Sequence, residues 1–80
     1  MEFNELKIMV LEILEESEAM SSDEILYSLD DDVEIDPKAL QMALLRYHRQ
    51  GLLHREKRGR NYYYEITERG IDRLNWLRDN

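Results

Sequence analysis

Apolar residues recur at helical spacing in four stretches of the chain. This spacing places them on one side of a helix, and it predicts helices over about residues 3–17, 22–29, 37–50 and 68–78. In the third stretch the predicted inward side consists of Leu40, Ala43, Leu44 and Tyr47.

Between the third and fourth helices the pattern changes. Residues 52–57 and 62–66 are predicted as two short strands that are partly β-branched or aromatic. The residues between them, Arg58-Gly59-Arg60-Asn61, predict a hairpin tip, since Gly and Asn tolerate positive φ. Gly51 is expected to end the third helix for the same reason. The predicted order is helix, helix, helix, hairpin (about 52–66), helix.

Three helix starts carry capping residues. Ser21 precedes the second helix and Glu24 follows three residues later, which is the spacing of a capping box. Asp36 precedes the third helix, with Pro37 at the first helical position. Thr67 is the predicted N-cap of the fourth helix.

Basic residues are concentrated in one part of the chain. Over residues 38–60 one acid, Glu56, stands against seven bases: Lys38, Arg46, Arg49, Arg55, Lys57, Arg58 and Arg60. The whole chain nevertheless has a net charge of −7, and residues 1–37 hold thirteen acids and a single base, Lys7. Such a one-sided distribution attracts a polyanion, which we expect at residues 38–60.

Length and composition restrict the class of protein. The 80 residues suffice for one domain, 1–80. There is no cysteine, so neither a disulfide nor a thiolate metal site is available. No apolar run exceeds four residues, whereas crossing a bilayer takes roughly 20. The acidic N-terminus does not resemble a signal peptide. We therefore expect a cytoplasmic protein with no membrane association.

The residues that usually carry catalysis or bind metals are not in a suitable pattern. No Gly-rich phosphate loop and no nucleophile with an adjacent base occur, so we predict no enzyme activity, cofactor or small-molecule ligand. The two histidines, His48 and His54, lack an obvious third zinc ligand.

An acidic run, Asp30-Asp31-Asp32 with Glu34 and Asp36, precedes the third helix. Its alternating carboxylates suggest a calcium loop. However, Ile35 stands where an EF-hand needs glycine, and Gln41 stands where its bidentate glutamate belongs. We interpret the run as a solvated turn in which Asp36 caps the next helix.

Two segments carry a resemblance to a known fold. The first is Ala43-Leu44-Leu45-Arg46-Tyr47-His48-Arg49-Gln50-Gly51-Leu52-Leu53, and the second is Arg58-Gly59-Arg60-Asn61-Tyr62-Tyr63-Tyr64-Glu65-Ile66-Thr67-Glu68-Arg69-Gly70. They resemble the recognition helix, wing and following helix start of winged helix-turn-helix regulators of the PadR-like and MarR-like families. The resemblance implies an α+β, mainly α fold: a three-helix bundle, a two-stranded β-hairpin wing and a C-terminal helix.

The same resemblance implies how double-stranded DNA would be bound. The third helix would enter the major groove, with Gln41 suited to adenine, Arg46 to guanine, and Met42 and Leu45 to thymine methyl groups. The wing, residues 57–61, would reach the backbone or minor groove. The remaining expected DNA contacts are Lys38 and Arg49 on phosphates and Lys57, Arg58 and Arg60 on the wing.

Two other functions stay open at this point. The chain is alternatively a winged helix used for protein–protein contact, with its acidic part docking a basic partner. It is also consistent with a replication or plasmid-maintenance factor that binds DNA without regulating transcription. A solvated basic face with ordinary surface arginines is the interpretation that requires no partner.

The first and last helices indicate a second copy of the chain. Apolar residues cover more than half the circumference of the first helix, and Trp76 lies off the core side of the last. Exposed apolar patches of this kind usually contact a partner. We therefore expect a homodimer whose interface includes Ile8, Leu11 and Trp76.

Overall fold

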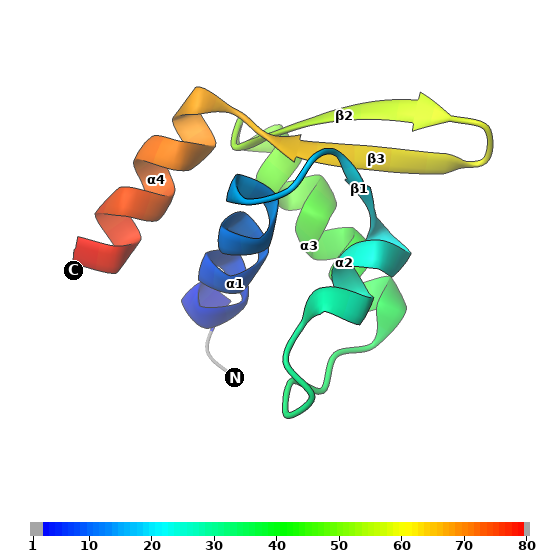
Figure 1. Cartoon of the computed structure of the whole chain (residues 1–80), viewed down its shortest axis with the longest axis horizontal. Helices are drawn as coiled ribbons and strands as arrows, with labels where there is room; N and C mark the ends of the chain where they lie inside the picture. The colour runs from blue at the N-terminus through cyan, green and yellow to red at the C-terminus, as the bar shows by residue number, and fades with distance from the viewer. Residues whose placement is uncertain (1–2, 80) are drawn as a thin grey trace.

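A computed structural model of the chain describes residues 3–79, and it has the predicted winged helix-turn-helix architecture (Figure 1). The elements in chain order are α1 (Phe3–Glu15), β1 (Met20–Ser21), α2 (Ser22–Ser28), α3 (Pro37–Arg49), β2 (Leu53–Arg58), β3 (Asn61–Ile66) and α4 (Glu68–Asp79). Helix α1 ends at Glu15, two residues before the predicted end.

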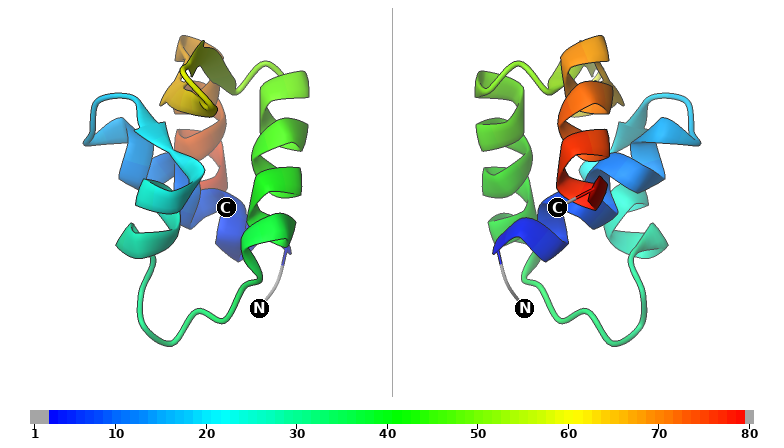
Figure 2. Two further views of the ribbon diagram at one scale, coloured as in Figure 1. Left: turned by 90° about the vertical axis from the view of Figure 1, so that its right-hand side faces the viewer. Right: turned by 90° about the vertical axis from the view of Figure 1, so that its left-hand side faces the viewer.

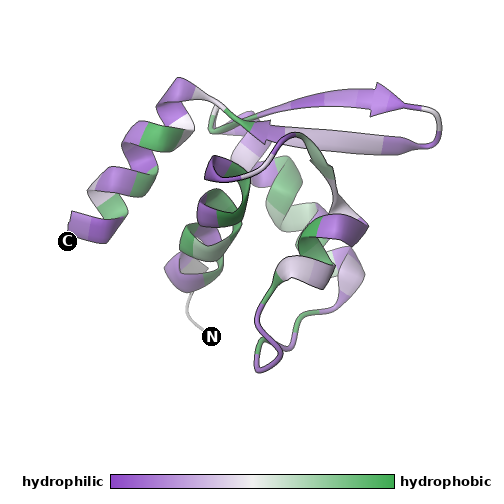
Figure 3. Ribbon diagram, viewed as in Figure 1, coloured by the Kyte–Doolittle hydropathy of each residue, from purple (hydrophilic) through white to green (hydrophobic). Residues whose placement is uncertain are grey.

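The hairpin of β2 and β3 projects beyond the helices on one side of the molecule, and α4 lies on the other (Figure 1). Helix α3 forms one edge of the molecule in both views of Figure 2. Hydrophobic positions lie on the helices and at the base of the wing, while the wing tip is hydrophilic (Figure 3). The wing tip is therefore held by its own strands and not by burial in the core.

The core lies between the helices and the base of the wing. Helix α3 contributes the predicted inward side, and Leu40, Ala43, Leu44 and Tyr47 are all buried. Helix α1 contributes Lys7, Val10, Leu11 and Leu14. A lysine on the buried side of α1 was not predicted, because the apolar pattern of this helix does not favour one inward direction.

The sheet has three strands, in the order β1-β3-β2, where the sequence predicted two. The added strand β1 pairs antiparallel with β3, and Met20 lies opposite Tyr64. Strands β2 and β3 pair from Leu53 opposite Ile66 out to the tip. The connection between α1 and α2 thus holds the base of the wing.

The capping predictions are confirmed. The Ser21 side chain accepts from the Glu24 backbone N–H at 3.2 Å, and the Ser21 N–H donates to the Glu24 carboxylate at 2.9 Å. Asp36 accepts from the N–H groups of Lys38 and Ala39. These bonds satisfy amides that a helix start otherwise leaves without a partner.

Thr67 joins three segments at the start of α4. Its hydroxyl accepts from the Gly70 N–H at 3.0 Å, which caps α4, and it lies 2.7 Å and 3.0 Å from the acceptor oxygens of Gly51 and Leu52. Gly51 has φ +79° and ends α3 as predicted. One side chain therefore connects the end of α3, the start of β2 and α4.

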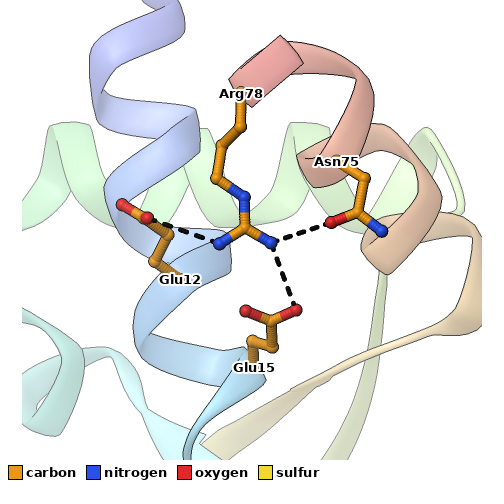
Figure 4. Close-up of polar contacts among 4 residues, drawn as sticks. All are labelled: Glu12, Glu15, Asn75 and Arg78. Carbon is orange, nitrogen blue, oxygen red and sulfur yellow. Dashed lines mark hydrogen bonds and ion pairs between the residues drawn. The ribbon is translucent and has the colours of Figure 1, made fainter.

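Arg78 connects α4 to α1 at the far end of α4 (Figure 4). Its guanidinium lies 3.6 Å from the Glu12 carboxylate and 3.4 Å from that of Glu15, and it donates to Asn75 at 2.8 Å. Arg78, Glu12 and Glu15 are all partly exposed. Ion pairs of this kind contribute about 0–1 kcal/mol to the free energy of unfolding. No helix within residues 3–79 has the length and apolar character needed to cross a bilayer.

Candidate nucleic-acid interface

The outward side of α3 presents polar and apolar groups together. Lys38, Gln41, Arg46 and Arg49 are exposed, Met42 is 51% exposed and Leu45 is half-buried. They lie opposite the buried side of the helix because helical spacing places them there. Every α3 residue of the predicted DNA-binding set therefore lies outside the core.

The two faces of the wing differ in composition. Residues paired across antiparallel strands share a face, so Arg55 and Tyr64 lie with Lys57 and Tyr62 on the face that also carries buried Leu53. We call this the inner face. The outer face carries the pairs Glu56 with Tyr63 and Arg58 with Asn61.

A hollow of about 310 Å³ lies between α3 and the wing, bordered by the inner face and by the tip residues Arg60 and Asn61. We call it the helix–wing hollow. Its lining comes from the helix and the wing, with one residue from α2: Ser22, Gln41, Met42, Leu45, Arg55, Arg60, Asn61, Tyr62 and Tyr64. The structure thus brings Gln41, Met42, Leu45 and Arg60 of the predicted set into one concave surface.

Arg55 belongs to this surface, although the predicted DNA-binding set omitted it. Its guanidinium lies 4.1 Å from the centroid of the Tyr62 ring, within the range of a cation–π contact. Arg55 keeps its positive charge in this contact and brings it to the lining of the hollow. The signal was present in the sequence, because Leu53, Arg55 and Lys57 alternate along one strand face.

Arg58 lies on the opposite side of the wing from Arg55. Its guanidinium is 3.7 Å from the Glu56 carboxylate and 5.0 Å from the centroid of the Tyr63 ring. Arg58 and Arg60 are two residues apart at the tip, yet only Arg60 lines the helix–wing hollow. The sequence analysis gave these two arginines the same role, whereas the structure places them in different surroundings.

Arg46 does not line the helix–wing hollow. Its charge acts on Lys7 of α1. Burial lowers the pKa of Lys7, and the positive charges of Arg73 and Arg46 lower it further. Lys7 Nζ donates to Gln50 Oε1 at 3.2 Å and lies 5.4 Å from the centroid of the Tyr47 ring.

The residues predicted for a dimer interface have different surroundings. Leu11 is 0% exposed and packs in the core of the single chain, so the prediction that it contacts a second copy is wrong. Ile8 is half-buried against the core. Trp76 is 60% exposed, and the Arg73 guanidinium lies 6.0 Å from its ring centroid.

The acidic run has no metal-binding geometry. Asp30, Asp31 and Asp32 are all exposed in the turn between α2 and α3. In the part of the chain that the structure describes, no three His, Cys, Asp or Glu side chains gather in a way that would hold a metal ion. Asp36 engages the first turn of α3.

Solved structures with this fold include proteins described as transcription regulators. A PadR family transcription regulator from Clostridium difficile superimposes with a TM-score of 0.80 and 21% identity over 92% of this chain and 83% of that one. The YusO protein from Bacillus subtilis superimposes with a TM-score of 0.76 and 19% identity, over 89% of this chain and 50% of that one. The transcriptional regulator BldR from Sulfolobus solfataricus superimposes with a TM-score of 0.74 and 21% identity, over 94% of this chain and 52% of that one. At these identities the likeness shows the fold.

Comparison with curated protein sequences finds no match. The family model described as PaaX-like protein, however, matches residues 10–70. That range begins within α1 and includes α2, α3, the wing and the first residues of α4, with every residue of the helix–wing hollow. The chain belongs to the PaaX-like protein family.

Proposed function

We propose that this protein binds double-stranded DNA in a sequence-dependent manner and regulates transcription as a pair of chains in the cytoplasm. Residues 1–80 form the single DNA-binding domain in this proposal. The observation that carries it is the helix–wing hollow, where the outward side of α3 and the cationic inner face of the wing border one concave surface. The winged-helix regulators with the same fold support it.

In this proposal α3 enters the major groove. Gln41 has the donor and acceptor that adenine requires, and Met42 and Leu45 offer apolar contacts for thymine methyl groups. These three residues line the hollow together. Lys38 and Arg49 contact phosphates on either side, and Arg46 reads guanine.

The wing takes a different part of the duplex. Arg60 and Lys57 reach the phosphate backbone beside the groove that α3 occupies, and Arg55 reaches it from within the hollow. Arg58, held on the outer face by Glu56 and Tyr63, contributes less. The excess of acid in residues 1–37 gives the chain an uneven charge distribution, which orients the protein on the duplex.

The test is the affinity for duplex DNA as a function of salt. A protein that neutralises about six phosphates loses about 1000-fold in affinity between 50 mM and 200 mM salt. We expect a fall of that size on random duplex, and tighter binding with the same steep slope on a sequence selected from a random pool. Absence of binding at low salt would favour use of the fold for protein–protein contact. Selected sites that lie away from promoters would favour the replication or maintenance role.

A further inference from the structure

On each of its faces the wing has a contact between a tyrosine ring and an arginine. On the inner face the Arg55 guanidinium lies 4.1 Å from the centroid of the Tyr62 ring. On the outer face the Arg58 guanidinium lies 5.0 Å from the centroid of the Tyr63 ring. Arg55 pairs with Tyr64, two residues from Tyr62, so Arg55 and Tyr62 are diagonal neighbours across the strands. Long and aromatic side chains can meet across such a diagonal.

The two arginines differ in their neighbours of opposite charge. The Glu56 carboxylate lies 3.7 Å from Arg58 and offsets its charge. Arg55, Tyr62 and Arg60, in contrast, line the helix–wing hollow, and no acid is among the residues that line it. The hollow therefore combines two positive charges with no negative charge in its lining, which suits an anion.

The Tyr62 ring restricts a side chain that is flexible by nature. An arginine loses rotamer freedom when it becomes fixed on a phosphate, and this loss opposes binding. Arg55 is half-buried and lies against the ring, whereas Lys57 and Arg60 of the same wing are exposed. A guanidinium that is already held in place loses less freedom when it binds. The contact with Tyr62 therefore favours the binding of an anion by Arg55.

We propose that Tyr62 is a positioning residue for DNA binding: its ring holds the Arg55 guanidinium at the helix–wing hollow, where Arg55 binds one backbone phosphate of the duplex. Tyr62 acts through Arg55 and needs no contact of its own with the DNA. The inference rests on the proposed function and deepens it, because it assigns one phosphate to an arginine and its supporting ring. On the outer face Tyr63 has no such role, since Glu56 competes for the Arg58 guanidinium.

A double-mutant cycle between Tyr62 and Arg55 tests this role, with fluorescence anisotropy on a duplex selected from a random pool. Tyr62→Leu removes the ring and should weaken binding about 5-fold, whereas Tyr62→Phe keeps the ring and should stay within about 2-fold of the wild type. Arg55→Ala should weaken binding about 10-fold. Adding Tyr62→Leu to Arg55→Ala should change the affinity by less than about 2-fold, because the group through which Tyr62 acts is gone.

Arg60 provides the matched control, because it lines the same hollow and carries the same charge. Arg60 has no part in the proposed positioning. Tyr62→Leu should therefore still weaken binding about 5-fold in the Arg60→Ala background, so that the two losses multiply.

A second measurement identifies the phosphate. Methylphosphonate linkages, which carry no charge, replace the phosphates of the selected duplex one at a time. We expect one position where the neutral linkage weakens binding of the wild type about 10-fold and that of Arg55→Ala by less than about 2-fold. The Tyr62→Leu protein should lie between these two values at the same position.

Several results would overturn the inference. Tyr62→Leu could bind like the wild type, or Tyr62→Phe could lose as much as Tyr62→Leu, which would assign the effect to the hydroxyl. The loss in Tyr62→Leu could also persist in the Arg55→Ala background, as it would if the substitution simply unfolded the wing. The methylphosphonate series could contain no position that depends on Arg55. In each of these cases the salt-dependent binding of the wild type, and with it the proposed function, would stand. A wild-type chain that binds no duplex would overturn both.

Discussion

At the scale of single residues, Gly70 fixes how closely α4 approaches the end of α3. A Cβ added at this position would collide with the backbone oxygen of Leu52 and come within 2.7 Å of Ile66 Cγ1. The backbone oxygen cannot move without disturbing its bonds to Thr67. The Thr67-Glu68-Arg69-Gly70 motif thus combines a helix cap with a contact that only glycine permits.

Gly70→Ala should therefore lower the free energy of unfolding by about 1–3 kcal/mol, as overpacking does. Alanine within a helix usually stabilises relative to glycine by about 0.5–1 kcal/mol, so the expected sign is the reverse of the usual one. Urea unfolding followed by circular dichroism measures the change. Asp72→Ala, at an exposed position of the same helix, should stay within about 0.5 kcal/mol of the wild type. A Gly70→Ala protein as stable as the wild type would remove the argument from close contact.

Lys7 is the second residue whose environment sets a measurable property. It is 6% exposed, and its pKa is lowered by burial and by Arg73 and Arg46. A lysine with a lower pKa in the folded state binds fewer protons there than in the unfolded state. The free energy of unfolding then rises as the pH rises from the folded pKa toward the ordinary value of 10.5.

We expect the wild-type protein to gain stability relative to Lys7→Met as the pH is raised from 7 to 10. Burial raises the pKa of Tyr47, which lowers stability above a pH of about 10. That loss occurs in both proteins, so the difference between them reports on Lys7. Urea unfolding at a series of pH values measures it. A difference that does not change with pH would mean that Lys7 has no lowered pKa.

At the scale of elements, the sequence predicted features that depend on neighbouring residues, and it did not predict features that depend on pairing between distant segments. The caps at Ser21, Asp36 and Thr67 were predicted because each capping bond joins residues no more than three positions apart. The strand β1 was missed because two residues, Met20 and Ser21, carry no pattern of their own and become a strand only by pairing with β3.

The candidate site was predictable to a similar extent. Helical spacing identified the outward side of α3, but the division of the wing into two faces depends on the pairing of β2 with β3. Leu11 was assigned to the wrong side because α1 has apolar residues around most of its circumference. The burial of Lys7 together with Leu11 shows which side faces inward.

The two faces of the wing lead to a prediction about DNA affinity. Arg60→Ala and Arg55→Ala should each weaken binding to all duplexes and reduce the salt slope by about one, because both residues line the helix–wing hollow. Arg58→Ala is the matched control, since its guanidinium lies against Glu56 and Tyr63 on the outer face. Fluorescence anisotropy at several salt concentrations measures both quantities. Equal losses for Arg58 and Arg60 would contradict the division into faces.

At the scale of the whole molecule, the dominant feature is a net charge of −7 with acids and bases in separate parts of the chain. Close ion pairs in the described region join Arg58 to Glu56 and Arg78 to Glu12 and Glu15, all of them partly exposed. Such pairs offset little of the repulsion among eighteen acids. Repulsion of this kind destabilises a compact state.

Salt should therefore stabilise the folded protein. Raising sodium chloride from about 20 mM to 500 mM shortens the screening length several-fold. We expect a gain of about 1 kcal/mol, seen as a rise of about 4–8 °C in the midpoint of thermal unfolding. The variant Glu16→Gln, Glu18→Gln, Asp31→Asn loses three negative charges and should show a smaller rise. A midpoint that falls with salt would indicate that attractive pairs outweigh repulsion.

The pairing of β1 with β3 also has a mechanical consequence. Because β1 pairs with β3 at Tyr63 and Tyr64, the wing has a third strand beside it near its base and none beyond Tyr62. If the proposed DNA complex forms, we expect Arg55, which lies opposite Tyr64, to keep its position relative to α3, and Gly59 and Arg60 at the tip to move more. Backbone amides should accordingly exchange with deuterium fastest at the tip and slowest beside β1.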